Sequence, residues 1–123
     1  MTRVARIVWV VAFLIGAFTH ARDIVMGGWL PYDFAPFLLN WFWTLLLPLD
    51  LLAAGLIAFR KRIGVLLGVA IMLADVGVNT WYAHATQWPA LFAALQWQSM
   101  FLGFVIGTAP LLWHSNASKT VRL

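Results

Sequence analysis

Hydrophobic residues in this chain gather into four long runs, with short polar segments between them. The runs cover residues 4–26, 36–59, 63–83 and 89–113. Each is long enough to cross a hydrocarbon layer of about 30 Å as a helix that rises about 1.5 Å per residue. Lipid offers the backbone no hydrogen bonds, so helices are the expected structure for such runs. The short connections favour an up-down arrangement of neighbouring helices.

Composition supports a membrane protein. The chain has 123 residues, of which 63% are hydrophobic and 10% are charged. Soluble domains are about half apolar and about a quarter charged. The chain contains no cysteine, which excludes disulfides and thiolate chemistry. We therefore expect one all-α integral membrane domain over residues 1–123, a four-transmembrane-helix up-down bundle.

The cations are distributed asymmetrically around the predicted spans. One side of the membrane would carry Arg3, Arg6, Arg60, Lys61, Arg62, Lys119 and Arg122. The other side would carry only Arg22. Because cytoplasmic loops carry an excess of Lys and Arg, we expect cytoplasmic N and C termini in a bacterial inner membrane. The net charge of +4 then reflects orientation in the lipid bilayer, and we expect no nucleic-acid partner.

Two aspartates fall inside the predicted spans. Asp50 lies ten residues before Arg60, and Asp75 lies thirteen residues after Arg62. At about 1.5 Å per residue, both carboxyls lie about 15–20 Å from the cationic turn, near the bilayer midplane. An acid at that depth is costly unless it is paired or neutralised, so a functional role is the default interpretation.

Further polar and aromatic residues are expected around these acids. Asp75, Asn79 and Tyr82 share one helical face, and Asn40, Trp43 and Asp50 share another. The predicted ligand-binding residues are Asp50, Asp75, Asn79, Asp23, His20, Asn40, Trp43, Tyr82 and Gln96. They would line a pocket that opens outward. The alternative is a hydrogen-bond network that only ties the helices together.

We expect no cofactor and no metal. His20 and His84 lie at the outer ends of two predicted spans, so a bis-histidine haem is an alternative. A zinc site would have only these two histidines and Asp23 as ligands.

Two pairs of glycines are spaced for close helix contact. Gly64 and Gly68 form one pair, and Gly103 and Gly107 form the other. Small residues at this spacing let neighbouring helices approach closely within a bundle or between copies of a chain.

Several segments resemble known membrane proteins. The stretches "YDFAPFLLNWFWTLLLPLDLL", "IMLADVGVNTWY" and "ALQWQSMFLGFVIGTAPLLW" resemble a group of small, uncharacterised four-span bacterial membrane proteins. More loosely, "THARD" and "LPLD" resemble the EXPERA group, which includes the emopamil-binding sterol isomerase. That resemblance implies a four-helix bundle with a hydrophobic pocket, in which Asp23 and Asp50 would be the acidic pair and His20 would lie nearby. This chain has no glutamate, and it carries the additional acid Asp75.

The leading functional hypothesis is a binding protein for a small hydrophobic or cationic ligand held against the transmembrane aspartates. Three alternatives stay open. One is a proton-coupled transporter that acts as a homodimer, and another is an EXPERA-like isomerase. The last is a structural subunit of a larger membrane complex. An enzyme is the less favoured class because the chain shows no recognised catalytic motif.

The first testable prediction concerns orientation. A reporter enzyme fused after Leu123 should be active only when it is of a type that works in the cytoplasm, because the cations fix that side. A fusion after Trp29 should show the opposite behaviour. Periplasmic activity of the fusion at Leu123 would contradict the predicted topology.

Overall fold

The computed structural model describes residues 1–117, which form four helices and no strand. Their bounds are α1 Thr2–Gly27, α2 Phe37–Ala58, α3 Arg62–Thr86 and α4 Pro89–Ala117. These bounds agree with the four predicted runs to within a few residues, which confirms the all-α class. All four helices are long and apolar enough to cross a membrane, which indicates a multi-pass membrane protein. Lys119 and Arg122, used above for orientation, lie outside the described residues.

The helix ends follow from local sequence. After α2, Arg60 adopts a left-handed conformation with φ of 59°. The Lys61 N–H then donates to the Leu56 carbonyl at 2.8 Å, which closes the helix end and allows α3 to start at once. α4 begins at Pro89, where the missing N–H has no helical partner to lose.

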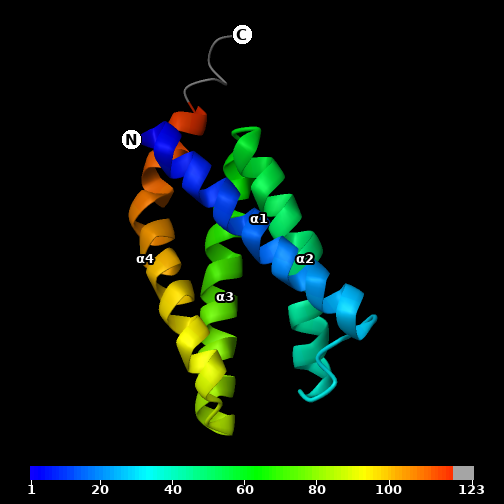
Figure 1. Cartoon of the computed structure of the whole chain (residues 1–123). Coiled ribbons are helices and arrows are strands. Elements are labelled where there is room, and N and C mark those ends of the chain that lie inside the picture. Colours follow the sequence, from blue (N-terminus) through cyan, green and yellow to red (C-terminus); the bar gives the residue numbers. More distant parts are fainter. Residues whose placement is uncertain (118–123) are drawn as a thin grey trace.

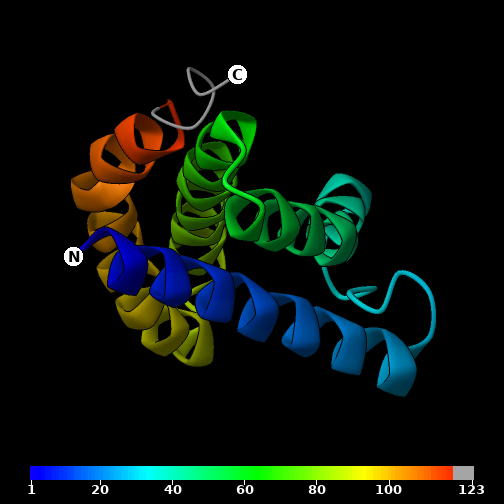
Figure 2. The ribbon, with the colours of Figure 1, turned by 90° about the horizontal axis from the view of Figure 1, so that it is seen from above.

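The helices form two pairs that diverge toward one end. The most extensive contacts are between α1 and α2 and between α3 and α4, and the sparsest are between α1 and α4. In Figure 1 the start of α1, the α2–α3 turn and the end of α4 lie together at the top, which we call the cationic end. The α1–α2 loop and the α3–α4 turn lie at the opposite end, which we call the loop end. Viewed from above, α1 runs obliquely across the other helices (Figure 2).

Trp9 organises the half of the bundle nearest the cationic end. Its side chain is fully buried, and its Nε1 donates to the Thr108 Oγ1 of α4 at 2.8 Å. It packs over Gly68 of α3, where an added Cβ would lie 2.8 Å from the indole ring. The absent side chain of Gly68 therefore makes room for the indole. One residue of α1 thus contacts both α3 and α4.

Two arginines connect the helix ends at the cationic end. Arg6 donates from Nη1 to the Ile57 carbonyl at 3.1 Å and from Nη2 to the Ser115 Oγ at 2.9 Å. Arg62 donates from Nε to the Trp113 carbonyl at 3.3 Å, and its guanidinium lies 4.7 Å from the centre of the Trp113 ring. These contacts hold the end of α4 against α1 and α3.

The glycine pairs provide the second prediction. A Cβ at Gly64 would lie 2.9 Å from the Ile57 backbone nitrogen, so α2 and α3 would have to separate. We expect Gly64→Ala to lower the free energy of unfolding by about 1–3 kcal/mol. The matched control is Gly103→Ala, where nothing lies within 4 Å of the added Cβ.

Gly103→Ala should leave the free energy of unfolding unchanged or raise it by up to about 1 kcal/mol, because alanine favours helix more than glycine does. The measurement is denaturant unfolding in mixed micelles, followed by circular dichroism. Equal effects at Gly64 and Gly103 would contradict the close contact between α2 and α3.

Candidate functional site

A partly open cavity of about 550 Å³ lies between the diverging helix pairs. This volume is within the range of roughly 300–1,000 Å³ found for small-molecule sites. Most of the lining is apolar or aromatic, and it comes from all four helices and both connections at the loop end. The polar side chains of the lining are Thr19, His20, Asp23, Tyr32, Asp50, Asp75, Asn79 and Gln98.

Asp50 is an acid of the cavity lining whose burial no hydrogen bond or ion pair from residues 1–117 compensates. Its side chain is 5% exposed, and it makes no hydrogen bond or ion pair with any residue in the described range 1–117. A Cβ added at Gly16 of α1 would lie 2.6 Å from the Asp50 Oδ2. The carboxyl therefore extends from α2 to the surface of α1, into space that Gly16 leaves free.

Asp75 belongs to a hydrogen-bond network centred on Asn79. The Asn79 Nδ2 donates to the Asp75 Oδ1 and to the Gln98 Oε1, both at 3.0 Å. Its Oδ1 accepts from the Trp43 Nε1 at 2.8 Å. An indole N–H can only donate, so the orientation of the Asn79 amide is fixed by this contact. The network joins α2, α3 and α4.

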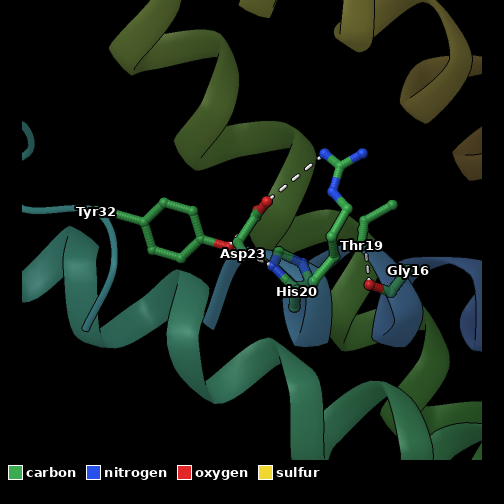
Figure 3. A network of polar contacts seen from close by, with 6 residues as sticks. Gly16, Thr19, His20, Asp23 and Tyr32 are labelled. Atoms are coloured by element: carbon green, nitrogen blue, oxygen red, sulfur yellow. Dashed lines mark hydrogen bonds and ion pairs between the residues drawn. The ribbon is translucent and has the colours of Figure 1, made fainter. Parts of the chain in front are cut away.

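A second network surrounds the Tyr32 hydroxyl at the loop end of the cavity (Figure 3). The hydroxyl donates to the Asp23 Oδ2 at 2.8 Å and lies 2.9 Å from the His20 Nδ1. Because the hydroxyl has a single hydrogen, the His20 Nδ1 must be the donor in the second contact. Arg22 lies 3.6 Å from the other oxygen of Asp23.

The α1–α2 loop is held in place by side chains. Asn40 accepts from the Tyr32 N–H and donates to the Leu30 carbonyl, both at 3.0 Å. Burial, followed by the hydrogen bond to Asp23, raises the pKa of the Tyr32 phenol far above its usual range. Tyr32 thus stays neutral and keeps donating to Asp23 in alkaline solution.

Aromatic rings cover the loop end of the cavity. Trp43 lies 5.4 Å from both Tyr32 and Tyr82, measured between ring centroids. Phe34 from the loop lies 5.4 Å from Trp88 of the α3–α4 turn. Edge-to-face contacts of this kind are favourable. We call these five residues the aromatic cluster.

The prediction for α4 was wrong about which of its glutamines faces the interior. Gln96 is exposed and does not line the cavity, whereas Gln98 lines it and accepts from Asn79. The interior face of α4 follows a heptad-like spacing through Leu91, Leu95, Gln98, Leu102, Val105 and Leu112. This spacing was the sequence feature that could have identified Gln98.

The remaining predicted site residues divide into two groups. Asp50, Asp75, Asn79, Asp23, His20 and Trp43 line the cavity together. Asn40 and Tyr82 are buried beside it without lining it, because Asn40 bonds the loop and Tyr82 packs on Trp43. Gly16 was not predicted, since its role depends on which residue of another helix faces it.

The histidines considered for haem lie in different surroundings. His20 lines the cavity, whereas His84 is exposed, packs against Phe92 with ring centroids 5.1 Å apart and does not line the cavity. Within residues 1–117, no group of three or more metal-ligating side chains is close enough to hold an ion.

No family model matches this sequence, and neither does any curated protein or solved structure.

The third prediction tests the Tyr32 network. The pKa of Tyr32 is raised above the ordinary phenol pKa of about 10. The stability that the neutral hydroxyl contributes is therefore fully present below pH about 10 and is lost only at a higher pH. The wild type and Tyr32→Phe are titrated with alkali while the absorbance at 295 nm is recorded. The difference between the two curves isolates Tyr32, and it should show no phenolate at pH about 10.

The same substitution should lower the free energy of unfolding by about 1–3 kcal/mol at neutral pH, since the hydroxyl loses its hydrogen bonds with both Asp23 and His20. A Tyr32 phenolate that forms at the ordinary pH would show that the hydroxyl is solvated and not bonded to Asp23.

Proposed function

We propose that this protein binds a small hydrophobic ligand carrying a cationic group, and that the cavity between the helix pairs is the binding site. The apolar and aromatic lining would contact the body of the ligand. The cationic group would pair with Asp50 and lie near Asp75. Trp43 and Trp88, which also line the cavity, would offer ring faces to the cation.

The observation that carries this proposal is the unpartnered carboxyl of Asp50. Removing a carboxylate from water without compensation costs several kcal/mol or more, and a bound cation or a proton offsets that cost. Asp50 is among the residues that line the cavity, so a ligand in the cavity can reach its carboxyl. A residue kept only for stability would instead be expected to have a protein partner.

The alternative of a purely structural role applies better to Asn79 than to Asp50. Asn79 connects three helices through contacts that use both of its donors and its acceptor. Asp50 lies outside this network and ties no helices together. We therefore assign the interhelical network to stability and the free carboxyl to ligand binding.

We also propose the orientation and location expected from the charges. The cationic end would face the cytoplasm of a bacterial cell, and the loop end would face outward across the inner membrane. A pocket with acidic side chains is also what the resemblance to the EXPERA group implies, and we propose similar pocket chemistry here.

The fourth prediction compares a cationic with a neutral ligand. Dodecylamine should raise the thermal unfolding temperature of the detergent-extracted protein, and dodecanol at the same concentration should raise it less. Asp50→Asn should weaken dodecylamine binding tenfold or more, equivalent to about 1.4 kcal/mol, and leave any dodecanol effect unchanged.

Asp50→Leu should abolish the difference between the unfolding-temperature shifts that dodecylamine and dodecanol cause. It should not lower the stability of the protein without ligand, because it removes a desolvated acid.

Gly16→Ala provides a test that keeps the carboxyl. The added Cβ would meet Asp50 at 2.6 Å and displace it, so dodecylamine binding should weaken as well. Gly77→Ala is the matched control, since nothing lies within 4 Å of its added Cβ. If neither dodecylamine nor a panel of other hydrophobic amines and sterols shifts the wild type, while Asp50→Leu loses stability, the structural role is the better explanation.

A further inference from the structure

We propose that the ligand reaches the cavity from the lipid phase, through an opening between α1 and α4, and is therefore an amphiphile dissolved in the bilayer. This inference rests on the proposed ligand-binding function and adds the class of ligand and its route. We call the opening, which is bordered by Ile15 on α1 and Trp97 on α4, the α1–α4 opening.

The two helices are joined only in the half nearest the cationic end. Arg6 bonds Ser115, and Trp9 bonds Thr108 at 2.8 Å. The rings of Phe13 and Phe101 then meet with centroids 5.6 Å apart. Beyond Phe13, within the part of the chain that the structure describes, no hydrogen bond, ion pair or ring contact joins α1 to α4.

The α1–α4 opening begins just past the last of these contacts. Ile15 follows Phe13 by two residues, and Trp97 precedes Phe101 by four. Because α1 and α4 run in opposite directions in Figure 1, both residues lie on the loop-end side of that contact, about 3 Å and about 6 Å along their helices.

The exposure of these two residues shows that the cavity reaches the outer surface here. Ile15 and Trp97 both line the cavity, yet they are 59% and 74% exposed. A residue that lines a cavity and also faces outward marks an edge of that cavity. This position lies within the apolar spans, so the surroundings at the edge are lipid.

The loop end of the cavity is covered by comparison. Phe34 and Trp88 also line the cavity and are 57% and 37% exposed, so the cavity has an edge at the loop end too, but there the two rings are in contact with each other. Tyr32 is held beneath them by Asp23 and Asn40. A water-soluble ligand would have to separate these contacts, whereas an amphiphile passing between α1 and α4 would not.

The Asp50 side chain lines the cavity to which the α1–α4 opening leads. Gly16, the neighbour of Ile15, is the residue whose added Cβ would meet the Asp50 Oδ2. An amphiphile entering here would bring its cationic group to the Asp50 carboxyl, which lines the same cavity, while its apolar chain still lay toward the lipid. The charge of the site and the surroundings of its opening thus select the same kind of molecule.

The absence of native cysteine allows a direct test by thiol labelling. The variant is Ala12→Cys, because Ala12 lines the cavity and takes part in none of the networks. The full chain is reconstituted in phosphatidylcholine vesicles and treated with N-dodecylmaleimide or with a membrane-impermeant sulfonated maleimide. Rates are normalised to Trp29→Cys, an exposed position on the α1–α2 loop. Met72→Cys, at a buried lining position, repeats the test if the first variant folds poorly.

We expect the lipid-soluble reagent to modify the cavity cysteine at least tenfold faster than the impermeant one. Adding Ile15→Trp should slow that modification about tenfold by narrowing the opening, and Phe34→Ala should leave it unchanged. Equal rates for both reagents, or acceleration by Phe34→Ala without any effect of Ile15→Trp, would overturn the lateral route.

Dodecylamine separates this result from the proposed function. If the cavity binds the amine, the amine should slow modification by N-dodecylmaleimide severalfold, and the neutral dodecanol should slow it less. Selectivity for the lipid-soluble reagent without protection by dodecylamine would confirm the opening and count against the ligand-binding function.

Discussion

The packing of Trp9 across Gly68 determines how the four helices can be arranged. The indole N–H needs an acceptor inside the membrane, since lipid supplies none, and Thr108 of α4 provides it. This contact fixes α1 over α3 and α4 near the cationic end, while the short α1–α2 loop holds the other end of α1 near α2. α1 must therefore run obliquely and part from α4 beyond Phe13 (Figure 1). The cavity is a consequence of that divergence.

The polar groups inside the bundle have different roles, although they lie close together. Asn79 uses both amide hydrogens and its oxygen in contacts that join three helices, so it stabilises the bundle without any ligand. Asp50 receives no hydrogen bond or ion pair from residues 1–117, so its desolvation lowers the stability of the protein without a ligand. Stability alone does not account for an acid in that position. The proposed binding of a cation would account for an acid that is buried in the lining of the cavity.

The sequence was sufficient to predict the helices and five of the eight polar side chains that line the cavity. Runs of apolar residues fix the number of spans, and the spacing of Asn40, Trp43 and Asp50 correctly predicts a buried face of α2. The interior face of α4 is harder to predict, because its lipid-facing and buried positions are both apolar and only the heptad-like spacing separates them. Gln98 was therefore missed in favour of Gln96. Gly16 was missed for another reason, since its importance arises only from the Asp50 side chain of a different helix.

The Asn79 network also bears on which carboxyl a ligand would contact first. A cation paired with Asp75 would compete with the Asn79 amide, and any rotation of that amide would remove the acceptor of the Trp43 indole. Trp43 is the member of the aromatic cluster that contacts Tyr32, Phe34 and Tyr82, so disturbing it would loosen the cover of the loop end. A cation paired with Asp50 disturbs none of these contacts. Under the proposed function, binding at Asp50 would let a ligand enter between α1 and α4 without opening the loop end to water, whose entry would weaken the same ion pair.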